Sequence, residues 1–133
     1  MTVKKILIAD DEAYIRLLIE DALEDFSEKG VTILTAQDGE AALRIIKDEE
    51  PSLVFLDVMM PKMNGFDVCQ MVKNELGLAH VHIILLTAKG QRDDIERGQA
   101  VGADDYITKP FDTDRLVDQV AAVLGKTEDT TRP

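Results

Sequence analysis

The chain has 133 residues and a net charge of −11, with 45% hydrophobic and 31% charged residues. This length suits one domain with a sizeable core, and the acidic balance argues against direct binding to nucleic acid or to an anionic membrane. No apolar run approaches the ~18 residues that a membrane span needs, and the first run is too short for a signal peptide. The single cysteine, Cys69, excludes an intrachain disulfide, so we expect a soluble, cytoplasmic protein.

Apolar periodicity predicts five strands that alternate with five helices. The strands are short apolar runs rich in β-forming residues, and the helices have apolar residues at three- and four-residue spacing. Asp38 and Asp112 are placed to cap helix starts, whereas Gly30 and Gly125 are placed to end helices. The expected strands are about 4–9, 31–36, 53–57, 81–87 and 105–108, and the expected helices about 12–27, 39–48, 65–76, 91–101 and 112–125.

This alternation implies an α/β fold, with a parallel sheet covered by helices on both faces and right-handed crossovers. The natural strand order is the flavodoxin-like 2-1-3-4-5, with the second strand at an edge. The helix over 91–101 has only Ile95 and small residues as apolar anchors, so we expect it to be the least firmly packed. We expect one domain over residues 1–125 and a polar, disordered tail over 126–133.

Four predicted strands end in polar residues of complementary chemistry. Asp10-Asp11, Asp57, Thr87-Ala88 and Lys109-Pro110 each follow an apolar run. Parallel strands bring these positions to one edge of the sheet, where open α/β sheets bind ligands. One polar strand end would mean only that loops are polar, but four together indicate a shared site.

Carboxylates dominate this predicted site. Three of them raise one another's pKa unless a cation intervenes, and hard oxygen ligands favour Mg²⁺ at Asp10, Asp11 and Asp57. Such a site suits phosphoryl transfer, with Asp57 as the nucleophile that forms an aspartyl-phosphate. Lys109 and Thr87 would then contact the phosphate oxygens, and the small Ala88 would leave room for them.

The sequence resembles the receiver domain of bacterial two-component response regulators, of the single-domain, CheY-like kind. The matching stretches occur in the right order over nearly the whole chain. They are Ile8-Ala9-Asp10-Asp11-Glu12, Phe55-Leu56-Asp57-Val58-Met59-Met60-Pro61, Asn64-Gly65, Leu86-Thr87-Ala88 and residues 102–111, GADDYITKPF.

The resemblance implies a signalling switch that accepts a phosphoryl group at Asp57 from a histidine kinase or a histidine phosphotransfer protein. It implies Mg²⁺ held by Asp10, Asp11, Asp57 and the backbone carbonyl of Met59, a phosphate held by Thr87 and Lys109, and a cis Lys109-Pro110 bond. Tyr106 and Thr87 would be the switch residues.

The same resemblance limits what the domain does and with whom. Such a switch catalyses only its own phosphorylation and slow dephosphorylation. It alters partner binding through the face of the fourth helix, fifth strand and fifth helix. The output would go to a downstream protein or to an effector domain missing from this sequence, from a monomer or a phosphorylation-dependent dimer.

The residues alone leave other classes open. A phosphatase of the haloacid dehalogenase type would need an acid where Met59 stands, and a flavodoxin-like binding module would need glycine and hydroxyl donors where Asp10-Asp11-Glu12 stands. His80 and His82 could bind a transition metal, although two ligands without a third nearby are more typical of a polar strand entrance.

Overall fold

Five parallel strands form one sheet in the order β2-β1-β3-β4-β5, which is the predicted order. The computed structural model describes residues 4–88 and 92–129. Each strand pairs in parallel with its neighbour because a helical crossover separates it from the next strand in the chain. The strands are β1 (Lys5–Ala9), β2 (Thr32–Ala36), β3 (Leu53–Asp57), β4 (His82–Ala88) and β5 (Asp105–Lys109).

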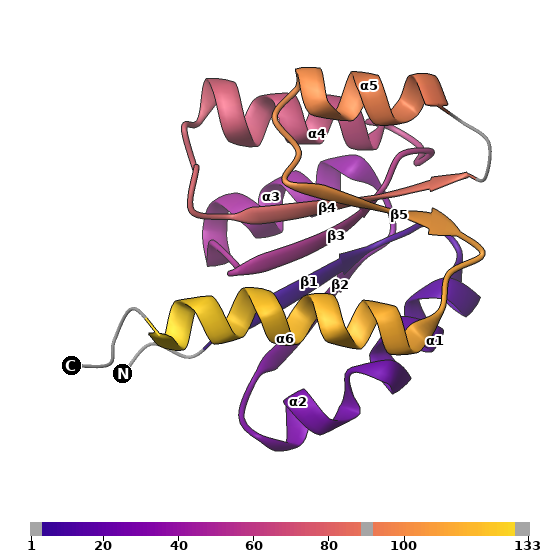
Figure 1. The fold of residues 1–133 in the computed structure, drawn as a ribbon. Helices are drawn as coiled ribbons and strands as arrows, with labels where there is room; N and C mark the ends of the chain where they lie inside the picture. Colours follow the sequence, from indigo (N-terminus) through magenta and orange to yellow (C-terminus); the bar gives the residue numbers. More distant parts are fainter. Residues whose placement is uncertain (1–3, 89–91, 130–133) are drawn as a thin grey trace.

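Helices cover both faces of this sheet (Figure 1). One layer contains α1 (Ala13–Ala22), α2 (Glu24–Glu28) and α6 (Thr113–Asp129). The other contains α3 (Gly39–Glu49), α4 (Gly65–Gln70), the π-helix η1 (Met71–Glu75) that continues α4, and α5 (Arg92–Ala100). Within the described part of the chain, no helix combines the length and apolarity that a membrane crossing requires.

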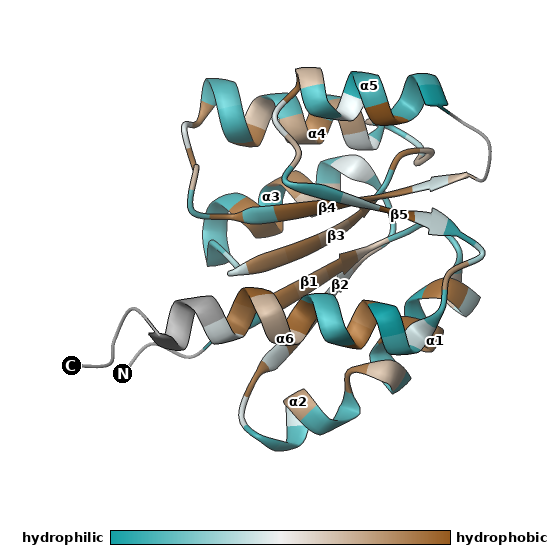
Figure 2. Cartoon of the chain, in the orientation of Figure 1, coloured by the Kyte–Doolittle hydropathy of each residue, from teal (hydrophilic) through white to brown (hydrophobic). Residues whose placement is uncertain are grey.

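The sheet separates two hydrophobic cores. Side chains alternate along β1, so that Leu7 belongs to the core beneath α3 and α4 while Ile8 belongs to the core beneath α1 and α6. The strands β1, β3 and β4 are apolar along most of their length (Figure 2), which is the composition expected of strands that helices cover on both faces. Cys69 is buried in the first core, as expected for a small core residue.

The first predicted helix is two helices. The chain leaves helical geometry at Leu23, whose ψ is 9°, and whose N–H lies within hydrogen-bond distance of two carbonyls, those of Ile19 and Glu20. Leu23 is fully buried beside Ile19, and the apolar stripe continues to the partly buried Phe26. The break therefore leaves the apolar spacing intact, which is why spacing alone did not predict it.

The third predicted helix widens into a π-helix after Gln70. The Leu76 N–H donates to the Met71 carbonyl at 2.8 Å, one residue further back than in an α-helix. In this segment Val72 is buried, and Lys73 Nζ lies 2.8 Å from Asp104 Oδ2 beside β5. The widened turn thus coincides with a tertiary ion pair to a distant segment.

The predicted helix boundaries are mostly confirmed. The Asp38 and Asp112 carboxylates each accept a backbone N–H at a helix start, at 2.8 Å from Ala41 and 2.9 Å from Asp114. Gly30 has a φ of +99° after α2, as expected for a glycine that ends a helix. The prediction for Gly125 is wrong, because α6 continues to Asp129.

Two predictions fall partly outside the described residues. The disordered tail was predicted for 126–133, where α6 occupies residues up to Asp129 and residues 130–133 lie outside the described part. The helix predicted to begin at Gln91 is described from Arg92 onward.

Candidate functional site

The four polar strand ends lie at the same edge of the sheet. In the strand register Ala9 pairs with Leu56, Asp57 with Leu86, and Ala88 with Lys109. Asp10 follows Ala9 directly, so all four ends share one level. The sheet thereby brings together carboxylates, a hydroxyl and an ammonium group from distant parts of the chain.

Asp10 is fully buried, and both of its carboxylate oxygens and its backbone N–H form hydrogen bonds. Its Oδ1 accepts a hydrogen bond from the Glu12 N–H at 2.9 Å, and its Oδ2 accepts a hydrogen bond from the Lys109 ammonium at 2.8 Å. Its own N–H donates to the Ala36 carbonyl at 3.2 Å. A buried charge is tolerated only when paired in this way, so Asp10 is a fixed part of the site.

Asp57 lies at the end of β3 and is 5% exposed. Its Oδ1 lies 3.4 Å from Lys109 Nζ and accepts the Met59 N–H at 3.3 Å. Burial, with the nearby Asp10 charge, raises the pKa of Asp57 to about 7, although Lys109 acts in the opposite direction. The carboxylate is therefore held in a site that disfavours its charge unless further positive charge arrives.

Lys109 connects the two buried aspartates. Burial alone would lower the pKa of its ammonium, but the hydrogen bond to Asp10 and the charge of Asp57 outweigh burial and raise that pKa. Lys109 therefore stays charged between the two carboxylates. The peptide bond between Lys109 and Pro110, at the end of β5, is cis, as predicted.

The loop after Asp57 is fixed by backbone contacts. Val58 donates to the Leu86 carbonyl at 3.2 Å, and Gly65 donates to the Val58 carbonyl at 2.9 Å. A Cβ on Gly65 would collide with the Asp57 carbonyl, so only glycine lets the start of α4 approach this closely. Met59, whose carbonyl is a predicted metal ligand, has its side chain 75% exposed at the rim.

Thr87 is 1% exposed, and its hydroxyl has no hydrogen-bond partner in the described structure. Buried hydroxyls normally have a partner, so an unpaired one at a strand end suggests that a ligand oxygen completes it. The next residue, Ala88, is exposed and small. The strand end thus combines a buried, unpaired hydroxyl with a small, exposed residue.

Among the described residues, one group of three acidic, histidine or cysteine side chains is close enough to hold a metal. It consists of Asp10, Asp11 and Glu12, with one oxygen of each within 4.8 Å of the others. Asp57 is not in this group and joins the site through Lys109. Hard carboxylate oxygens fit Mg²⁺, and the exposure of Asp11 and Glu12 leaves room for water or phosphate ligands. The sequence analysis did not name Glu12 as a ligand.

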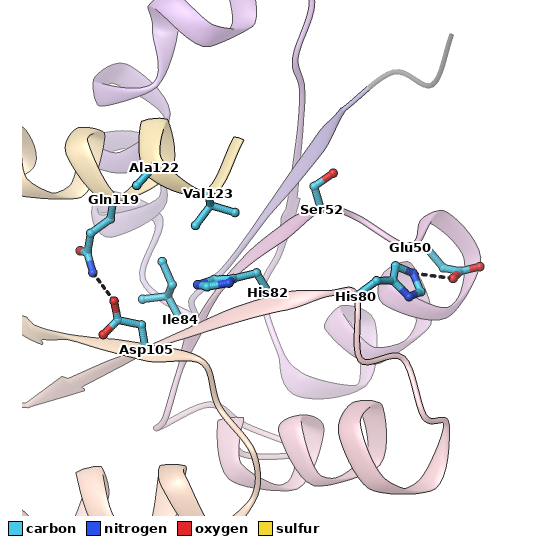
Figure 3. Close-up of a pocket in the computed structure, with 9 residues that line it drawn as sticks. All are labelled: Glu50, Ser52, His80, His82, Ile84, Asp105, Gln119, Ala122 and Val123. Carbon is cyan, nitrogen blue, oxygen red and sulfur yellow. Dashed lines mark hydrogen bonds and ion pairs between the residues drawn. The ribbon is translucent and has the colours of Figure 1, made fainter. Parts of the chain in front are cut away.

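His80 and His82 do not converge. Both residues line a pocket of about 500 Å³. Their two rings point in opposite directions within it (Figure 3). His80 Nε2 lies 2.9 Å from Glu50 Oε1, and His80 precedes β4 rather than standing on the strand. This arrangement favours the polar strand entrance over a transition-metal pair.

Tyr106, the predicted switch aromatic, is 38% exposed on the edge strand β5. It borders a pocket of about 190 Å³ that separates it from Ile95 and Gly98 of α5. Gly98 is the one buried residue of α5. The face formed by α5, β5 and α6 therefore has a lightly anchored helix beside the aromatic residue.

Comparison with known proteins agrees with this geometry. Residues 6–121 match the response regulator receiver domain family model. The chain is 43% identical over 127 residues to the phosphate regulon transcriptional regulatory protein PhoB of Pseudomonas aeruginosa. It is 41% identical over 125 residues to the alkaline phosphatase synthesis transcriptional regulatory protein PhoP of Bacillus subtilis.

These alignments differ in how much of each protein they cover. They include 96% and 94% of this chain but 54% and 50% of the two relatives, so the chain spans about half their length. The solved REC domain of AraT, a response regulator from Geobacillus stearothermophilus, matches 98% of this chain and 100% of its own, at 32% identity and a TM-score of 0.85. The similarity therefore concerns one domain.

Proposed function

The chain belongs to the response regulator receiver domain family of two-component systems, and from this membership we propose that Asp57 is its phosphoacceptor. The phosphoryl group would come from a histidine kinase or a histidine phosphotransfer protein. The observation that carries the proposal is the buried constellation at one sheet edge. Asp57 there shares Lys109 with Asp10, beside the unpaired Thr87 hydroxyl.

In the reaction, an Asp57 carboxylate oxygen attacks phosphorus in line with the leaving group. The new bond joins oxygen to phosphorus, the phosphorus–nitrogen bond of the donor breaks, and the donor histidine keeps the electron pair. Mg²⁺, held by Asp10, Asp11, Asp57 and the Met59 carbonyl, would supply positive charge to the phosphoryl oxygens.

The other side chains of the site orient the phosphoryl group and neutralise its negative charge. Lys109 already lies between two carboxylates, so its ammonium can follow the negative charge as it moves onto the phosphate. The Thr87 hydroxyl gains a phosphate oxygen as the acceptor that it lacks. Ala88 leaves space for that oxygen. These groups serve the domain's own phosphorylation and slow dephosphorylation, which makes the domain a switch rather than an enzyme with other substrates.

The rival phosphatase assignment is not supported by any feature of the site. A haloacid dehalogenase-type enzyme protonates its leaving group with an acid two residues after the nucleophile. That position is Met59, whose thioether has no proton to give, and whose side chain is 75% exposed. The alternative flavodoxin-like module is disfavoured by the acidic loop after β1, which would repel a phosphate without a metal.

We propose that the output goes to a protein partner or to an effector domain outside this sequence. PhoB and PhoP are named as transcriptional regulators and are about twice as long as the matched region. The net charge of −11 argues against direct contact between these residues and nucleic acid. We further propose a cytoplasmic location, a receiver unit over 1–125, and a monomer or phosphorylation-dependent dimer.

The phosphoacceptor assignment is tested by intact-mass measurement. Incubation with acetyl phosphate and Mg²⁺ should add one phosphoryl group to the wild type and to the control Asp67→Asn, an exposed residue of α4. Asp57→Asn should remain unmodified, and a chelator should prevent the reaction in the wild type and in Asp67→Asn. Phosphate that persists in Asp57→Asn, or forms without divalent ions, would overturn the assignment.

A further inference from the structure

Arg16 of α1 is a charged side chain that contacts the site and has no role in the mechanism above. Its Nη1 donates to the backbone carbonyl of Asp10 at 2.7 Å. The side chain is partly buried and reaches back from the second turn of α1 to the end of β1. This bond ties the helix to the loop that carries the acid cluster.

The Asp10 carbonyl has a particular position in this loop. It is the first carbonyl after β1, and among the described residues no backbone N–H donates to it. A buried carbonyl without a donor is costly, so the guanidinium supplies a bond that the sheet does not. The Asp10 side chain and N–H are held separately by Lys109, Glu12 and Ala36.

Holding this carbonyl also orients Asp11. The Asp10 oxygen and the Asp11 nitrogen belong to one planar peptide unit, so fixing the oxygen fixes the plane from which Asp11 departs. Asp11 itself is exposed, and within the described part of the chain no hydrogen bond or ion pair holds its carboxylate. The direction of that carboxylate therefore depends on the backbone.

We propose that Arg16 is a positioning residue for the metal site, acting on Asp11 through the Asp10–Asp11 peptide. By holding this peptide it keeps the carboxylate of Asp11 near those of Asp10 and Glu12, whose oxygens all lie within 4.8 Å of one another. The inference rests on the proposed function of this site as a Mg²⁺-dependent phosphoacceptor. Arginine suits the task because its planar, charged fork is more strongly oriented than a lysine ammonium.

The test measures Mg²⁺ affinity without a phosphodonor, by NMR titration of the purified chain. Arg16→Met keeps the length of the stem and should weaken Mg²⁺ binding roughly tenfold, as is usual for loss of a group that orients a metal ligand. Arg16→Lys should recover part of the affinity. The matched control Arg44→Met, an exposed residue of α3, should leave it unchanged.

A double-mutant cycle identifies the route of the effect. If Arg16 acts through Asp11, then Arg16→Met should change Mg²⁺ affinity by less than about twofold in an Asp11→Asn background. Circular dichroism establishes folding first, and Arg16→Leu, which also lacks a hydrogen-bond donor, replaces Arg16→Met if that variant does not fold.

Two outcomes would overturn the inference. The first is Mg²⁺ affinity within twofold of the wild type in Arg16→Met; an altered KM for acetyl phosphate in that case would place Arg16 in contact with the phosphodonor instead. The second is the same loss of Mg²⁺ affinity in the wild-type and Asp11→Asn backgrounds. Failure of wild-type Asp57 to accept phosphate would instead overturn the proposed function. The two failures are distinguishable because the Mg²⁺ titration is measured without phosphorylation.

Discussion

At the scale of single residues, Asp57 is disfavoured as a carboxylate in the metal-free fold. Its pKa is raised from 3.8 to about 7, first by burial and then by Asp10. Between these two pH values the folded state binds more protons than the unfolded chain. Stability therefore falls as pH rises through this window and levels off above it.

This ionisation predicts a pH-dependent stability that a single substitution removes. In chelator, the wild type should melt at a lower temperature at pH 8 than at pH 5, and Asp57→Asn should lose most of that fall. One unit of difference between the folded and unfolded pKa of Asp57 changes the free energy of unfolding by about 1.4 kcal/mol. That corresponds to a change of roughly 4 °C in melting temperature for a domain of this size. Thermal melts across pH check the prediction. Parallel curves for the two proteins would mean that Asp57 is not disfavoured.

At the scale of elements, we expect Thr87 and α5 to link the site to the surface formed by α5, β5 and α6. The Thr87 hydroxyl is unpaired at the end of β4, and the pocket of about 190 Å³ beside Tyr106 separates β5 from α5. Phosphate at Asp57 should draw the hydroxyl toward it, because a dianion is a strong acceptor. Tyr106 can then turn inward, and α5 can shift at low cost because Gly98 is its one buried residue.

Thr87→Ala should separate phosphorylation from this response. The variant should still accept phosphate at Asp57, because the carboxylate and Lys109 are unchanged. With beryllium fluoride as the phosphoryl mimic, NMR shift changes should extend over residues 87–112 in the wild type and stay near Asp57 in the variant. A wild type without changes around Tyr106 and α5 would show that the domain carries phosphate passively.

At the scale of the whole molecule, the acidic site should make folding depend on Mg²⁺. A ligand that binds only the folded state stabilises it by about 2.7 kcal/mol at 100 times its Kd. Mg²⁺ should therefore raise the melting temperature of the wild type clearly more than that of Asp57→Asn. Because the chain carries a net charge of −11, NaCl at matched ionic strength is the control for general screening. Equal responses of both proteins to Mg²⁺ would contradict a metal shared by Asp57.

The sequence by itself determined the sheet and the position of the candidate site. Apolar runs buried on both faces define β1, β3 and β4, and the polar residues that end them fall at one edge because parallel strands share a direction. The caps at Asp38 and Asp112 were equally predictable, since a helix start needs an acceptor supplied within three residues.

Only the tertiary structure decided the features that depend on contacts between distant segments. The break at Leu23 preserves the apolar spacing, the π-helix at Met71–Glu75 accompanies the ion pair of Lys73 with Asp104, and α6 continues through Gly125. Arg16 on the Asp10 carbonyl likewise has no signature in spacing. A local sequence pattern indicates which face of a helix or strand is buried. The features above depend instead on which group of another element contacts that face. Such a contact partner is distant in the sequence and becomes known only from the fold.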